Sequence, residues 1–173
     1  SAKVSIARVE SPGAVVDESV PFRFGFREVK IRGRDLYLNG TRIHLRALTC
    51  AAMARGADRA CRAGALDTCR RMKDMGFNFA IANNYNLMPG AISHIDSTLD
   101  AFDETGMLYS FTMPHMKDFG NNRFLDDPEN VARYKKLAAW AVSRVRRHPS
   151  VIAYTTSHNA VGYTGKQDHL KLD

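Results

Sequence analysis

Two polar residues that follow a short apolar run near the C-terminal end are the strongest candidates for chemistry. Residues 151–154 (VIAY) come after a proline and are followed by three hydroxyl residues, and then by His158 and Asn159. This pattern predicts a buried strand with a polar tip. An imidazole can transfer a proton, and an amide can hydrogen-bond a ligand. We therefore expect His158 and Asn159 at the mouth of a pocket, and the alternative for His158 is a hydrogen-bonded structural histidine.

Strands and amphipathic helices that alternate along the sequence would position this tip. Buried strands are expected at residues 43–48, 77–82, 107–112 and 151–154, and helices at 65–75, 91–105 and from Asp127 onward. Such alternation predicts parallel strands joined by right-handed crossovers. The fold class is therefore α/β, either an open doubly wound sheet or the first half of a (β/α)8 barrel. No glycine-rich phosphate loop follows the first strand, so we expect no dinucleotide site.

The expected helices carry start and stop signals and a buried face. Asp127 is a capping residue before Pro128, and Gly76 and Gly106 end the two earlier helices. The residues predicted to be buried at helical spacing are Leu66, Cys69, Met72 and Met75, then Ile92, Ile95, Leu99 and Phe102, and finally Val131, Leu137, Trp140, Ala141, Val142 and Val145.

The first 45 residues follow a period of two, which is typical of strands. Residues 3–9 and 22–31 alternate between polar and apolar side chains, and residues 11–13 and 18–21 have turn composition. Asn39 and Gly40 separate two further alternating runs. This pair is a strong hairpin signal, so a two-residue turn is expected there.

Length and composition bound the class of protein. The chain has 173 residues, and a closed eight-stranded barrel needs roughly 250, so it is either a smaller α/β domain or part of a larger protein. Hydrophobic residues make up 45% and charged residues 25%, which is globular composition, and no run approaches the roughly 20 apolar residues of a membrane span. The N-terminus has no apolar core for a signal peptide, so the compartment stays open.

Charge and cysteine content exclude two kinds of function. The net charge of +7 comes from scattered arginines without interleaved aromatic residues, so we expect no nucleic-acid binding, although a positive field favours an anionic ligand. Cys50, Cys61 and Cys69 show no metal-type spacing with histidine. Free thiols are favoured over a Cys50–Cys61 or Cys61–Cys69 bridge, and no metal site is expected.

Several motifs in order resemble one enzyme family. Residues 24–29 (FGFREV) and 38–46 (LNGTRIHLR) are similar to the junction between the β-sandwich and the catalytic TIM barrel of glycoside hydrolase family 2, the β-galactosidase and β-glucuronidase group. Residues 71–78 (RMKDMGFN), 103–108 (DETGML) and 147–152 (RHPSVI) are similar to its approaches to strands two, three and four. The resemblance implies a partial barrel at residues 35–173, preceded at residues 1–34 by a strand segment from the sandwich or linker.

The chain departs from the family at the positions that carry the reaction. The family ends its fourth strand in Asn-Glu, where the glutamate is the general acid/base, and this chain has His158 and Asn159 there. The family's second-strand arginine corresponds to Ile81, and strand three ends without the usual Asp-Glu. The nucleophile would lie near a seventh strand that this sequence does not reach. His158 or a loop acid such as Asp118 is then the remaining candidate for proton transfer.

The resemblance also suggests where carbohydrate would bind. The amides of Asn83 and Asn84 would bond sugar hydroxyls and Tyr85 would stack on a ring, or the asparagines would cap the next helix. His115 lies on a long loop and Tyr163 follows the last strand. Each has a second interpretation, a solvated histidine and a tyrosine that covers an open sheet edge.

The sequence thus predicts a divergent member or fragment of a glycoside hydrolase, or else a non-catalytic carbohydrate-binding or interaction module. No cofactor is expected. The expected partners are a carbohydrate, neutral or anionic, the rest of a larger polypeptide, and a second copy paired through open sheet edges. The resemblance is compatible with secretion or a periplasmic location.

Overall fold

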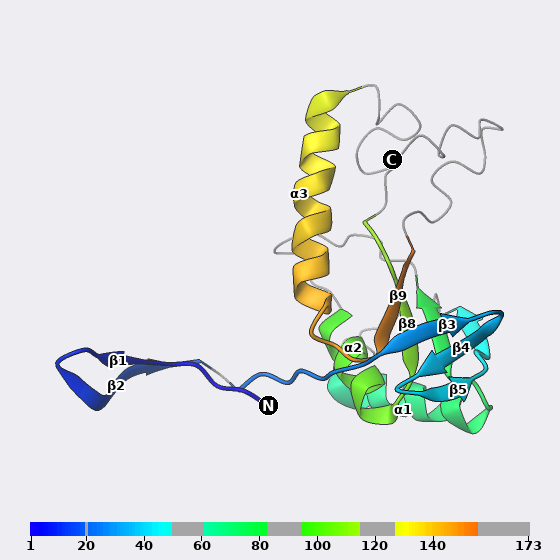
Figure 1. Cartoon of the computed structure of the whole chain (residues 1–173), viewed down its shortest axis with the longest axis horizontal. Helices are drawn as coiled ribbons and strands as arrows, with labels where there is room; N and C mark the ends of the chain where they lie inside the picture. Colours follow the sequence, from blue (N-terminus) through cyan, green and yellow to red (C-terminus); the bar gives the residue numbers. More distant parts are fainter. Residues whose placement is uncertain (20, 50–60, 83–94, 115–126, 156–173) are drawn as a thin grey trace.

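The chain folds into a half-barrel with a small antiparallel sheet beneath it and a hairpin arm (Figure 1). The computed structural model describes residues 1–19, 21–49, 61–82, 95–114 and 127–155. Parallel strands β6 (Ala47–Thr49), β7 (Phe79–Ala82), β8 (Leu108–Thr112) and β9 (Val151–Thr155) lie in sequence order. This order is that of consecutive βα units, so the predicted partial (β/α)8 barrel is confirmed.

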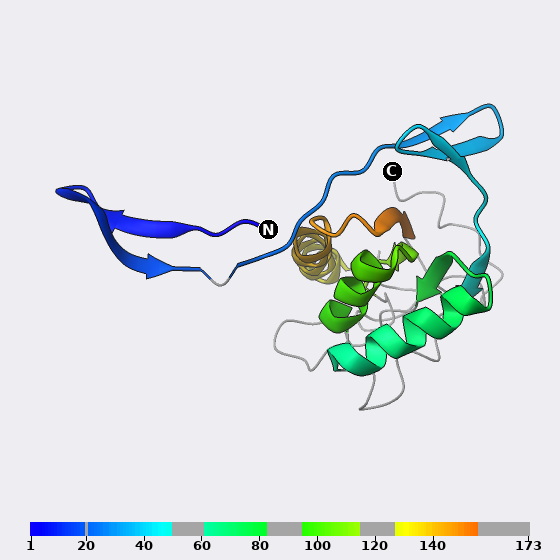
Figure 2. The ribbon, with the colours of Figure 1, turned by 90° about the horizontal axis from the view of Figure 1, so that it is seen from below.

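Three helices cover one face of the parallel sheet (Figure 2). They are α1 (Arg62–Asp74), α2 (Ile95–Thr105) and α3 (Pro128–Val145). Their buried residues form one core with alternate residues of the strands; the members of this core include Leu66, Cys69, Met72, Ile95, Leu99, Phe102, Ala141, Val145, Ala80, Tyr109, Phe111 and Val151. The predicted buried faces of α1 and α2 are thereby confirmed, apart from Ile92, which lies outside the described residues. On α3 the prediction holds for Ala141 and Val145, whereas Val131, Leu137, Trp140 and Val142 are only partly buried. Met75, however, is 65% exposed, because the helix ends one residue before it.

The predicted caps set the helix ends. The Asp127 side chain accepts from the backbone N–H groups of Glu129 and Asn130, as expected for an N-cap ahead of a proline. Gly76 has φ 88° and Gly106 has φ 69°, the left-handed conformation that ends a helix at little cost when the residue is glycine. Among the described helices, none is long and apolar enough to cross a membrane.

The Asn-Gly hairpin formed as predicted. Strands β4 (Asp35–Leu38) and β5 (Thr41–Ile43) pair antiparallel, and Asn39 and Gly40 both have positive φ. Strand β3 (Val29–Arg32) adds to the other edge of β4. The first buried strand was predicted at residues 43–48, which is wrong. Ile43 instead ends β5, and β6 begins only at Ala47 and is largely exposed at its two ends.

The N-terminal arm also differs in detail from the prediction. β1 (Ser5–Arg8) and β2 (Ser11–Glu18) pair antiparallel, so residues 11–13 open a strand and the turn is at residues 9–10. Only Val29 onward forms the strand expected at 22–31, apart from one bridge between Phe22 and Ala2. The arm protrudes from the half-barrel with apolar side chains exposed on it, a feature of strands that belong to a larger sheet (Figures 1 and 2).

Candidate functional site

The inner face of the half-barrel can be assigned from strand register. Tyr109 and Phe111 point to the helices, since both belong to the core and the Tyr109 ring lies 5.1 Å from that of Phe102. Side chains alternate along a strand, so Ser110 and Thr112 of β8 point to the opposite, inner face. Residues paired in register share a face, which places Ile81 and Thr155 on the inner face as well.

The inner face becomes more polar from the amino to the carboxyl ends of the strands. Its first layer, Ala47, Phe79 and Leu108, is apolar, and its next layer holds Thr49, Ile81 and Ser110. Ser110 Oγ lies 2.7 Å from Thr155 Oγ1, which ties β8 to β9. In barrels of this kind the reaction takes place at the carboxyl ends of the strands. In the described part of the chain, this end presents hydroxyl groups and one isoleucine.

The seven predicted site residues follow strands β7, β8 and β9 in sequence, within eight residues of the strand ends. They are Asn83, Asn84, Tyr85, His115, His158, Asn159 and Tyr163, and all lie outside the described residues, as do Asp118 and Cys50. Their proposed roles therefore stay predictions. The hydroxyl groups of Ser110 and Thr112 were not predicted as part of the inner face, whereas Thr155 belongs to the polar tip predicted after residues 151–154. Their polar types within an otherwise apolar run were the available signal.

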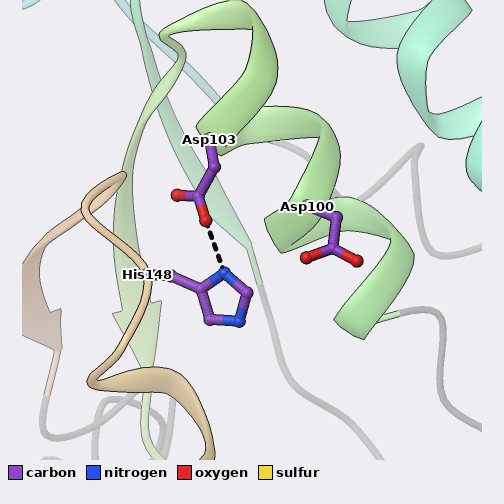
Figure 3. Close-up of side chains that lie close together, drawn as sticks. All are labelled: Asp100, Asp103 and His148. Atoms are coloured by element: carbon purple, nitrogen blue, oxygen red, sulfur yellow. Dashed lines mark hydrogen bonds and ion pairs between the residues drawn. The ribbon is translucent and has the colours of Figure 1, made fainter. Parts of the chain in front are cut away.

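A second polar cluster lies at the opposite, amino end of the sheet (Figure 3). Asp103 of α2 accepts through Oδ1 from the backbone N–H of Ser150 at 3.0 Å, and its Oδ2 lies 2.6 Å from Nδ1 of His148. His148 is 1% exposed. Burial raises the pKa of Asp103, but the hydrogen bonds from His148 and Ser150 outweigh this effect and hold that pKa below its usual value. This carboxylate therefore fastens α2 to the turn before β9.

The other family-like motifs meet at the same end. A Cβ atom on Gly25 would lie 2.6 Å from Cγ of Pro149, so the 24–29 segment passes close over the turn before β9. Asn78 ties the turn before β7 to the turn before β6, because its amide accepts from Arg46 N–H at 2.7 Å and donates to His44 O at 2.8 Å. These motifs thus hold the barrel floor, the end that in this architecture serves stability.

The two described cysteines lie at the start of α1 and within it, Cys61 exposed and Cys69 buried. Cys61 and Cys69 are not bridged to each other, so a Cys61–Cys69 bridge is excluded, and the prediction of a free thiol is confirmed for Cys69. Burial raises the pKa of the Cys69 thiol to about 11. At neutral pH this side chain is a small apolar group in the core.

Solved structures similar to this chain include several glycosidases. The chain is similar to a β-D-mannosidase from Dictyoglomus thermophilum (18% identity, TM-score 0.60), over 85% of this chain and 18% of that one. It is similar to a β-glucuronidase from Ruminococcus gnavus (22% identity, TM-score 0.61), over 84% of this chain and 23% of that one. It is also similar to a β-glycosidase from Bacteroides vulgatus (18% identity, TM-score 0.61), over 98% of this chain and 21% of that one. The chain spans about a fifth of the length of these proteins.

At this level of identity the likeness shows a glycosidase-like fold. No protein-family model matches the chain, and no curated protein matches it. The comparisons therefore show the fold of the chain and leave its function to be proposed.

Proposed function

We propose that the chain is the first half of the catalytic barrel of a carbohydrate-active protein related to glycoside hydrolase family 2, divergent at its reaction centre. The observation that carries this proposal is the floor of the barrel. The motifs by which the sequence resembles that family contact one another there, Gly25 with Pro149 and Asp103 with His148. Residues 1–34 then belong to a preceding sandwich or linker, whose sheet would cover the apolar arm.

The proposed carbohydrate site is the carboxyl edge of the sheet. Thr155 ends β9 on the inner face, and His158 and Asn159 follow three and four residues later in the sequence. In this proposal they stand where the family has Asn-Glu, of which the glutamate is the general acid/base. An amide cannot protonate a leaving oxygen, and loss of a positioned proton donor costs about 10²–10⁴-fold in rate. A retaining glycosidase also needs a second carboxylate about 5–5.5 Å from the first.

An assay of the full-length protein that contains this chain tests the proposal. The substrates are a panel of neutral and uronic aryl glycosides, and the variant is His158→Ala. His44→Ala is the matched control, because His44 is an exposed histidine at the other end of the barrel. We expect slow turnover that falls further in His158→Ala and is unchanged in His44→Ala. Turnover that His158→Ala leaves unchanged removes this residue from the mechanism.

A non-catalytic carbohydrate-binding module is the second candidate. It is favoured by the inner face, where Ile81, Ser110 and Thr155 occupy the described strand ends without a carboxylate among them. Calorimetric titration with neutral and anionic oligosaccharides separates the two candidates. Saturable binding without turnover supports the module, and turnover by the protein rejects it.

The outer strands of the sheet suggest a partner. Strands β6 and β9 each pair on one side only within the described part of the chain, and open edges of a parallel sheet need cover. In the full-length protein further strands would supply it. For the chain by itself we propose pairing with a second copy, which light scattering tests; a monomer at high concentration would contradict it.

A further inference from the structure

A small cavity lies between the antiparallel sheet and the floor of the half-barrel. Its volume is about 140 Å³. Its apolar lining comes from the segment before β3, from β4, from α2, from the start of β8 and from the turn before β9, and consists of Phe26, Leu38, Phe102, Met107, Leu108 and Pro149. An apolar cavity of roughly 150 Å³ can hold one benzene molecule, so this cavity has room for a single ring or a branched chain of about six carbons.

The aromatic ring of Phe26 marks the open side of this cavity. Phe26 lines the cavity and is nevertheless 88% exposed, whereas Phe102 and Met107 in the same lining are fully buried. The Phe26 ring meets that of Phe24 edge-on, with 5.6 Å between the centroids. A ring bound in the cavity would remove part of Phe26 from water, which favours binding of an apolar group.

An arginine in the cavity wall has no partner in the described part of the chain. Arg27 lines the cavity and is half-buried, and its guanidinium makes no hydrogen bond or ion pair with a described residue. The neighbouring acid Glu28 pairs with Lys30 instead. A half-buried guanidinium loses part of its hydration and keeps five N–H donors to satisfy. An anionic acceptor that enters the cavity would satisfy some of them.

Two further donors lie at the cavity. Asn39 Oδ1 accepts from Glu28 N–H at 2.8 Å, which leaves the NH₂ group of this lining side chain as a donor. Lys73 Nζ is 3.4 Å from the carbonyl oxygen of Gly106, which also lines the cavity, and Lys73 has no acidic partner among the described residues. The polar groups around the cavity are therefore mainly donors, and two of them are cationic.

The acid in the lining is already engaged. Asp103 Oδ1 accepts from Ser150 N–H at 3.0 Å, and Oδ2 lies 2.6 Å from Nδ1 of His148, toward which the carboxylate is directed (Figure 3). The negative charge of Asp103 is thus held by the turn before β9, and Arg27 and Lys73 remain without an acid. This balance favours an anionic ligand over a cationic one.

We propose that this cavity binds a small monocarboxylic acid whose apolar part is a single ring or a branched chain of about six carbons. The apolar part lies against Leu38, Phe102 and Met107, and Phe26 covers it. The carboxylate accepts from the Arg27 guanidinium, whose paired N–H groups match the two carboxylate oxygens, and from the Asn39 amide. This inference is independent of the proposed function, because the cavity lies at the amino ends of the strands, opposite to the strand tips.

The sequence predicted a preference for anionic ligands but no place for one. Asn39 was explained by the hairpin turn, and Arg27 by a family-like motif. Only the fold brings both to the side of α2 and to the start of β8, since these residues are more than 60 positions apart in the chain.

Titration of the isotope-labelled chain with benzoate, followed by NMR, tests the proposal. We expect saturable shifts of the backbone N–H signals of Asn39, Gly106 and Met107, with a Kd on the order of 1 mM, which suits a ligand of this size. Benzamide has the same ring without the charge, and acetate has the charge without the ring. Each should bind at least about tenfold more weakly than benzoate.

The decisive variant is Arg27→Gln, which removes the cation and keeps a side chain that can hydrogen-bond. It should weaken benzoate binding at least about tenfold and leave benzamide binding unchanged. Arg34→Gln is the matched control, because Arg34 is an exposed arginine between β3 and β4 that does not line the cavity. This control should bind benzoate as the wild type does.

Three results would overturn the proposal. They are the absence of saturable shifts with benzoate, saturable shifts confined to residues away from the cavity, and equal affinity of the wild type for benzoate and benzamide. Unchanged benzoate affinity in a folded Arg27→Gln variant would also reject it. An unchanged pattern of the other N–H signals establishes that the variant is folded. If it is not folded, the comparison of benzoate with benzamide on the wild type decides.

Discussion

Removal of the Asp103 carboxylate should destabilise the barrel floor more than any other single change to a described acid. Asp103 accepts from the backbone of Ser150 and bonds the ring of His148, and both partners are buried. Hydrogen bonds to a charged group contribute about 1.5–3 kcal/mol each, and a buried donor left without an acceptor adds a desolvation penalty. We expect Asp103→Ala to lower the free energy of unfolding by about 3–5 kcal/mol, the range for breaking a buried pair.

Urea denaturation followed by circular dichroism measures this loss. Asp103→Asn keeps an acceptor for Ser150 and should lose about half as much. Asp67→Ala is the control, because its pair with Arg71 is exposed and should contribute at most about 0.5 kcal/mol. A loss below about 1 kcal/mol in Asp103→Ala would refute the view that this carboxylate holds the floor together.

Three further predictions concern pH, a close backbone approach and a helix cap. Because the folded-state pKa of Asp103 is depressed, its contribution is present above the unfolded-state pKa of roughly 3.9 and is lost as pH falls through the folded value. Urea midpoints of wild type and Asp103→Ala should therefore converge in acid. Gly25→Ala should cost about 1–3 kcal/mol by thermal unfolding, because its Cβ atom would meet Pro149 at 2.6 Å, whereas Gly13→Ala, with open space around it, should not destabilise through a clash; equal losses would contradict the close approach. Asp127→Ala should lower stability by about 1 kcal/mol through loss of the N-cap, and an unchanged Tm would show that α3 does not depend on it.

Local rules predicted the elements whose ends are set by backbone chemistry. Gly76 ends α1 because a positive φ is easy only for glycine, and Asn39-Gly40 turns the β4–β5 hairpin for the same reason. Asp127 begins α3 because its side chain bonds the first free N–H groups. Each of these signals acts over four residues or fewer. They could therefore be recognised without knowledge of the fold.

The first strand of the barrel was mispredicted because two long-range contacts decide where it begins. Residues 43–48 alternate and are apolar enough for one strand, but Ile43 pairs with Leu36 of β4 and so belongs to the antiparallel sheet. Asn78 then bonds His44 O and Arg46 N–H, which fixes the bend between the two sheets. Asn78 is more than 30 residues away from both. The pattern of residues 43–48 alone cannot show whether they form one strand or are divided between the antiparallel and the parallel sheet.

The position of the family-like motifs explains why they predicted the fold. Gly25 lies against Pro149, Asn78 bonds the turn before β6, and Asp103 bonds the turn before β9, all at the amino ends of the strands. These contacts at the amino ends do not depend on the residues at the carboxyl ends, because the two ends are built from the same strands but from different side chains. Ile81 and Ser110 lie on the inner face above the floor and take no part in these contacts. Substitutions at the carboxyl edge should therefore change ligand binding with little effect on stability, and substitutions at the floor should do the reverse.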